Sequence, residues 1–287
     1  ITPGVQFGAD APDALILNQG DLVAGQDLTL QAGAVNSSGT LTANNGQVWV
    51  EAVAGDVSVQ AIAAEAATVV ASHNVMLDES RLITHGDLLI QADNTVRVRD
   101  SADNPVQVWA DGDLTLQGNR GIDILALNHP ETPFQSTGNL SLVSDGAVSG
   151  DAHFASGGGF SILDLAGNSG TFISLYDPII SAQTDVVFGN YIGTSLLVES
   201  TGSITAGDIT INGPDTLIPI SCGTDCVLLH TTPAVILRSG LATLAYAPSD
   251  PADAATYTPN SAYIDGGGVV SSVNGGAVQA DLSGLSH

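Results

Sequence analysis

The sequence contains no lysine and only five arginines, against 30 acidic side chains, so the 287-residue chain carries a formal net charge of -25. A charge of this size repels phosphate backbones and anionic lipid surfaces. No run of about 18 apolar residues is present, which is the length that a membrane-spanning helix needs. We therefore expect neither a nucleic-acid partner nor insertion into a membrane.

Aromatic residues are also scarce, at 5% of the chain, so a core must be built from Val, Leu, Ile and Ala. The printed chain begins at Ile1 and shows neither an initiator Met nor a basic and then apolar leader. Such a beginning is typical of a processed chain or a fragment, and we expect one of the two.

One short phrase recurs along the chain: Gly, then Asp or Asn, then apolar residues alternating with polar ones. Copies begin near residues 25, 55, 86, 112, 138 and 207. Asp87, Asp113 and Asn139 are each 26 residues apart, which aligns the leucines at 88, 114 and 140. Other copies are spaced differently: Asp27, Asp56 and Asp87 by 29 and 31 residues, and Asp185 and Asp208 by 23. Repeats of this length are typical of solenoids.

Between two copies of the phrase lie further strand-like segments. The interval from 87 to 113 holds three short alternating segments separated by turn residues, the second and third at 94–100 and 104–111. Three strands per coil predict a right-handed parallel β-helix with coils of roughly 20–30 residues, in which Leu88, Leu114 and Leu140 form one buried stack. We expect an N-terminal segment at 1–20, β-helix repeats over 21–212 and irregular coils over 213–287, with a cysteine loop and a Pro-rich arm.

An antiparallel sandwich is the main alternative fold, because short strands with frequent turns suit it as well. The aligned columns argue against it, as does the lack of a hairpin signal at the repeats of Asp111-Gly112, which are His85-Gly86 and Thr137-Gly138. The alanine-rich stretch 61–67 fits either a helical turn or a tight corner.

Cys222 and Cys226 are the only cysteines and lie four residues apart beside glycine. The spacing predicts a local disulfide in an oxidising compartment, with two reduced thiols as the alternative. A zinc site that adds His230 would have three ligands, one short of a closed structural site.

The residues do not indicate an enzyme. Without lysine, the base of a polysaccharide lyase would have to be an arginine, and Arg97 and Arg99 are more simply surface ion pairs. The acids lie mostly in turns rather than converging as glycosidase carboxylates do. We assign no catalytic or cofactor-binding residues. Stacked Asp and Asn turns could supply oxygen ligands to Ca²⁺, so calcium is a possible ligand without named metal residues.

The segments 176–216 and 234–240, with the Gly-Asp-Leu-x-Leu repeats as weaker support, resemble secreted β-helical exoproteins of the filamentous-haemagglutinin type, the passengers of two-partner secretion, and most of all cyanobacterial versions. That family's N-terminal secretion domain carries an Asn-Pro-Asn-Gly motif, whereas here Asn104-Pro105 is followed by Val106. The chain is then a mid-body segment or a relative that reaches the surface by another route. The resemblance implies an extracellular or cell-surface location and a structural, adhesive or matrix role.

We therefore predict a non-enzymatic extracellular building block of a surface filament or matrix. Its subunits would form a homo-polymer head to tail, with the N-terminal segment, including Val5–Phe7 and the apolar run 14–17, adding a strand to the next copy. The alternative is a secreted adhesin that binds a glycan or a protein of a neighbouring cell surface. Scarce aromatics favour the building block, and we expect Trp49 and Trp109 to pack in or against the coil.

Overall fold

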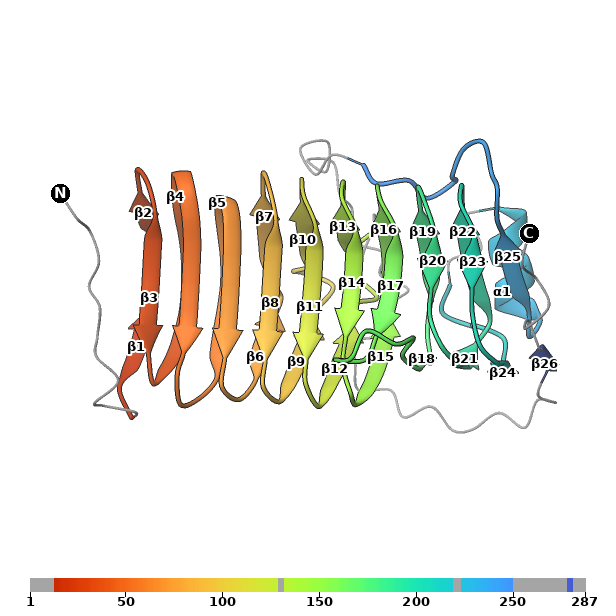
Figure 1. Cartoon of the computed structure of the whole chain (residues 1–287), viewed down its shortest axis with the longest axis horizontal. Helices are drawn as coiled ribbons and strands as arrows, with labels where there is room; N and C mark the ends of the chain where they lie inside the picture. Colours follow the sequence, from red (N-terminus) through yellow and green to blue (C-terminus); the bar gives the residue numbers. More distant parts are fainter. Residues whose placement is uncertain (1–12, 129–131, 219–222, 250–277, 281–287) are drawn as a thin grey trace.

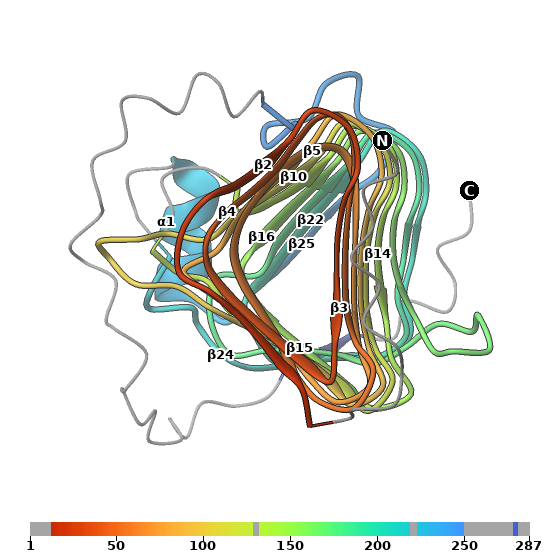
Figure 2. The ribbon, with the colours of Figure 1, turned by 90° about the vertical axis from the view of Figure 1, so that its left-hand side faces the viewer.

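The computed structural model describes residues 13–128, 132–218, 223–249 and 278–280. The chain winds into coils that stack along one axis, and neighbouring coils are joined by parallel strand pairing (Figure 1). Seen from the N-terminal end, the chain runs clockwise as it recedes from the viewer, so the coil is right-handed (Figure 2). The predicted right-handed parallel β-helix is confirmed.

Each coil contributes one segment to each of three faces. The long strands β4 (Ala34–Ala52) and β5 (Val57–Ala71) run through all three. The first face continues with β1 (Leu15–Asn18), β6 (Val75–Asp78), β9 (Thr95–Arg99), β12 (Gly121–Leu125), β15 (Ala147–Asp151), β18 (Phe172–Ser174), β21 (Tyr191–Thr194) and β24 (Ile209–Gly213). The second holds β2 (Leu22–Ala24), β7 (Arg81–Thr84), β10 (Gln107–Ala110), β13 (Phe134–Ser136), β16 (His153–Ser156), β19 (Ile179–Ala182), β22 (Leu196–Ser200) and β25 (Val235–Arg238). The third holds β3 (Leu28–Ala32), β8 (Leu88–Ala92), β11 (Leu114–Gly118), β14 (Leu140–Val143), β17 (Phe160–Leu163), β20 (Val186–Val187) and β23 (Ile204–Thr205).

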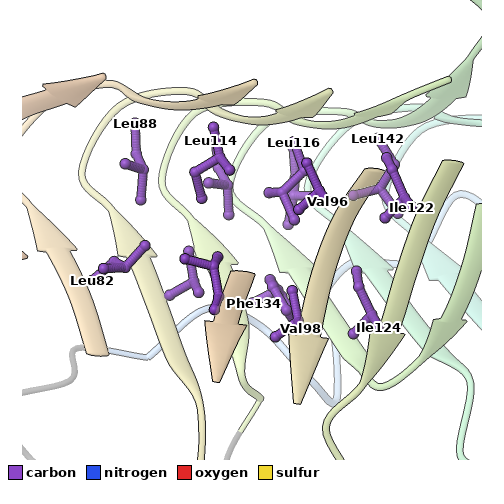
Figure 3. Close-up of a cluster of buried hydrophobic side chains, with 14 of the residues drawn as sticks. Leu82, Leu88, Val96, Val98, Leu114, Leu116, Ile122, Ile124, Phe134 and Leu142 are labelled. Atoms are coloured by element: carbon purple, nitrogen blue, oxygen red, sulfur yellow. The ribbon is translucent and has the colours of Figure 1, made fainter. Parts of the chain in front are cut away.

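The core consists of columns of apolar side chains that run along the axis. Leu88, Leu114 and Leu140 are direct register partners and are at most 1% exposed, so the predicted stack is confirmed. Figure 3 shows side chains from different faces pointing at one another across the interior. The alternation of apolar and polar residues places every second side chain inside, which is why this sequence can close a coil around itself.

Coil length varies, and the corners take up the difference. On the third face, the step from Leu88 to Leu114 takes 26 residues, whereas the step from Val186 to Ile204 takes 18. Strand positions stay in register because the extra residues form loops at the corners between two faces, as in the loop at 164–170 (Figure 2). The longer spacings of 29 and 31 residues read from the sequence are not coil lengths.

The recurring phrase marks two different corners. Asp27, Asp87 and Asp113 precede third-face strands, whereas Asp56 precedes Val57, which pairs with Val35 on the first face. Asp208 likewise precedes a first-face strand. The equivalence drawn between Asp27, Asp56 and Asp87 is therefore wrong, because the phrase encodes a turn followed by a strand and both corners require that sequence.

The structure also explains why glycine precedes the acidic residue. Asp87 Oδ1 accepts the backbone N–H of Asp113 one coil later at 2.9 Å, and Asp113 Oδ1 accepts that of Asn139 at 2.7 Å. The glycine of each later coil lies directly over the carboxylate below it, so a Cβ on Gly112 would overlap Asp87 Oδ1. We call this arrangement the Asp–Gly ladder.

The coil is modified at its C-terminal end. Helix α1 (Thr224–Thr231) packs on the outside of the second face, where Leu229 joins Ile179 and Leu197 in a small apolar cluster (Figure 2). Strand β26 (Val278–Ala280) pairs antiparallel with β24. The alanine-rich stretch 61–67 lies within β5, so the helical alternative is wrong for it.

Candidate functional site

The first coil leaves the N-terminal end of the core partly uncovered by described residues. Its inward-pointing Ile16, Leu22, Leu28 and Leu30 are only partly buried, whereas Leu114 in the middle of the coil is fully buried. Strands β1, β2 and β3 each pair with β4 on one side alone among the described strands. Backbone groups on their other side can accept a further strand.

The C-terminal end has a matching opening on two of its faces. Ile204 and Ala206 at the end of the third face, and Val235 and Leu237 at the end of the second, are also only partly buried. Within the described part of the chain, β23 pairs with β20 and β25 pairs with β22, each on one side. The first face differs, because β26 already pairs with β24.

The two open ends belong to the same columns. Register partners connect Leu22, coil by coil, to Leu237 on the second face. On the third face they connect Leu28 to Ile204 in the same manner. The second-face column has ten members and the third-face column nine. A second copy placed on the axis with Leu22 next to Leu237 would therefore continue the second-face column directly, and on the third face it would leave room for one further strand between Ile204 and Leu28.

A buried acidic cluster fastens the C-terminal segment to the coil. Asp215, which follows β24, accepts the backbone N–H of Asp177 and that of Leu217, and its own N–H donates to Leu229 O on α1 at 2.9 Å. Asp177 also lies 2.7 Å from His153 Nε2. Asp177 and Asp215 are 0% and 1% exposed, so solvent and solutes do not reach them. We assign this cluster a structural role, in which it attaches α1 and the segment before it to the coil.

Burial raises the pKa of Asp215 from its usual value to about 7, and the neighbouring Asp177 carboxylate adds to the rise. Burial likewise raises the pKa of Asp151, whose Oδ1 accepts the backbone N–H of Leu175 at 2.6 Å. The acids of the Asp–Gly ladder lie at exposed corners, so the chain uses aspartate in two distinct environments.

The residues singled out by sequence lie apart from one another. Arg97 and Arg99 form ion pairs with Asp78 and Asp123 on the outside of the first face, at 2.6 and 2.5 Å. In the described ranges 13–128, 132–218 and 223–249, no three His, Cys, Asp or Glu side chains are grouped as a metal site. Calcium stays a prediction, and the ladder carboxylates that could bind it already accept backbone N–H groups.

The predicted cysteine pair is described only in part. Cys226 is buried on α1, with its Sγ 3.4 Å from the Tyr246 hydroxyl. Cys222 and the strand expected at Val5–Phe7 lie outside the described residues, so both calls stay predictions. His230 Nδ1 lies 3.1 Å from the Ile218 carbonyl oxygen.

The structure differs from the sequence-based expectations at two features, Trp49 and the cluster of Asp177 and Asp215. Trp49 points outward and is 42% exposed, so it does not pack into the coil, whereas Trp109 is 7% exposed and packs against it as expected. The cluster of Asp177 and Asp215 joins residues 38 positions apart, and no local pattern marks it.

Comparison with known proteins does not add a relative: no family model, no curated protein and no solved structure matches the chain. None of the helices in the described ranges has the length and apolar character needed to cross a membrane.

Proposed function

We propose that this chain is a non-enzymatic structural unit that stacks head to tail into a filament or matrix outside the cell. The observation that carries the proposal is that the second-face column begins with Leu22 and ends with Leu237, both only partly buried and both on strands that pair on one side among the described strands. A contact between unlike ends does not close on itself, so it grows into a fibre. Both backbone pairing and apolar burial drive it.

The lopsided charge and the likeness to secreted β-helical exoproteins support the extracellular location. In an oxidising compartment, Cys222 and Cys226 form a local disulfide. Alkylation of the unfolded, non-reduced chain tests this pairing: we expect no reaction before reduction and two labelled cysteines after it. Two labelled thiols before reduction would contradict it.

The filament is tested by placing a charge at the N-terminal end of one column. Leu22→Glu puts a carboxylate on the inward side of β2, where an incoming copy would have to bury it, so we expect assembly to be lost. The matched control is Val23→Glu on the same strand, because Val23 points outward and is 67% exposed. Electron microscopy should show filaments for the wild type and Val23→Glu, and none for Leu22→Glu.

Two further measurements make the result interpretable. Circular dichroism should give the same β spectrum for both variants. Both substitutions lie in the first coil, which pairs with only one other coil, so the remaining coils should keep their strands. The Leu22→Glu chain keeps an intact C-terminal end, so small amounts of it should shorten wild-type filaments. A wild-type chain that stays monomeric at high concentration, with and without Ca²⁺, would refute the proposal.

A further inference from the structure

The third face differs from the rest of this acidic molecule, because its strands present almost no charge. Among the outward-pointing residues of its nine strands, the only charged one is Glu51. Glu51 accepts hydrogen bonds from Gln31 Nε2 at 2.7 Å and Trp49 Nε1 at 3.4 Å. The first face, by comparison, carries the ion pairs of Arg97 and Arg99.

The outward residues of the third face form two regular rows. The strands are in register, so one side chain of each row recurs at every coil, about 4.8 Å apart. The first row is Thr29, Trp49, Thr68, Leu89, Thr115, Ser141, Ser161, Val187 and Thr205. The second row is Gln31, Glu51, Val70, Gln91, Gln117, Val143 and Leu163. Apart from Trp49 and Glu51, the side chains of both rows are small hydroxyls, amides or branched apolar groups.

The size of the face matches a protein interface. Nine strands span about 40 Å along the axis, and strands of up to five residues are about 16 Å wide, which gives roughly 600 Å² on each copy. Two such faces together bury about 1,200 Å², the lower bound of standard stable interfaces. The loop at 164–170 projects beside one edge of the face and limits how far a partner can extend there (Figure 2).

We propose that the third face is a lateral self-association surface, on which two copies of this chain pair face to face. A second copy fits for two reasons. Its rows repeat at the same coil spacing, so side chains of the two faces interdigitate along the whole length. In addition, the strands of the third face carry almost no charge, so two chains of charge -25 can approach through this face with little repulsion between the strands. This pairing lies at right angles to end-to-end stacking and does not depend on it.

The corners that border the face carry the ladder acids Asp27, Asp87 and Asp113. These acids surround the pairing surface with negative charge, so pairing should strengthen as salt screens the border. An interface built on salt bridges would weaken instead. The sign of the salt dependence therefore separates the two kinds of contact.

The experiment uses the full chain carrying Leu22→Glu, so that end-to-end stacking does not interfere. Sedimentation velocity is recorded from low salt to about 1 M NaCl, where screening acts over only about 3 Å. We expect a monomer–dimer equilibrium that shifts at least tenfold toward the dimer at high salt. Trp49 fluorescence should shift to the blue on pairing, because the exposed indole becomes covered.

A matched pair of variants places one charge on the third face or on the first face, at two positions of the long strand β5. Thr68→Glu sits on the third face in β5, and Ser58→Glu sits on the first face in β5, and both positions are half-buried and point outward. Thr68→Glu should abolish the dimer, and Ser58→Glu should leave it unchanged. Equal effects of the two variants would overturn the proposal.

Two outcomes with the Leu22→Glu chain also count against it. One is a chain that stays monomeric at every salt and protein concentration. The other is a Trp49 response to cello-oligosaccharides, which are neutral linear glucans, while the protein stays monomeric, because the face would then be a glycan-binding surface. Filaments that form in the wild type but never pair side by side would reject lateral association and leave end-to-end stacking intact.

Discussion

The corners of the coil and its C-terminal segment use the same residue, aspartate, in opposite ways. In the Asp–Gly ladder, exposed carboxylates accept one backbone N–H each and repeat along the axis. In the cluster below α1, Asp177 and Asp215 are buried side by side and occur once. The ladder contact is the same between successive coils, whereas the cluster connects the coil to the segment before α1 at the C-terminal end only. In this molecule, the aspartates that join successive coils are therefore different from the aspartates that hold the C-terminal segment.

The largest expected effect concerns the buried pair and pH. The folded-state pKa of Asp215 is about 7, above its usual 3.8, so the fold favours the protonated acid. The stability that this group contributes is fully present below about pH 3.8 and is lost as pH rises through about 7, a change on the order of a few kcal/mol. Amide exchange within α1 should therefore be slowest near pH 4 and, after correction for intrinsic rates, faster at pH 8.

Asp177→Asn sharpens this test. Asp177 has a left-handed backbone with φ of 48°, which asparagine also tolerates, and the variant removes the neighbouring negative charge. The other groups in the cluster are Asp151, His153, Tyr176 and Tyr191. We expect a smaller loss of protection between pH 4 and 8 in the variant. A wild-type profile that is flat over this range would contradict the buried-pair interpretation.

The next largest effect concerns the glycine of the ladder. Gly112→Ala places a methyl group on Asp87 Oδ1 and on the backbone below it, so we expect a loss of about 2 kcal/mol from overpacking. Gly25→Ala is the control, because no atom lies within 4 Å of its added Cβ. Urea unfolding should separate the two, and equal midpoints would show that the ladder tolerates a side chain.

The smallest effect concerns the carboxylate of the ladder. Asp113→Ala removes the acceptor of the Asn139 N–H at an exposed corner, which should cost about 1 kcal/mol. Asp113→Asn should be close to neutral, because Asn139 already accepts the Gly159 N–H at 2.9 Å in the same way. If both substitutions cost the same in urea unfolding, the acceptor is not what stabilises the corner.

The sequence predicted what repeats and did not predict what occurs once. Leu88, Leu114 and Leu140 could be aligned because each column imposes the same residue type at a constant strand position. The phrase around Asp56 was placed on the wrong face because the local code for turn and strand is the same at two corners. Asp177 and Asp215 were invisible, since their environment is created by packing between coils and the segment before α1.

Because each coil pairs with the coil before it, 18 to 26 residues earlier at the steps from Val186 to Ile204 and from Leu88 to Leu114 and 39 residues earlier where α1 is inserted before β25, folding in this molecule is a one-dimensional growth process. Each finished coil is the template on which the next one orders, and stability grows with every added coil. The end of one chain offers the next subunit the same template, with Leu237 in the place of an inner column residue. In the filament that we propose, assembly and the folding of one more coil would be the same physical step, carried out once between chains and many times within one.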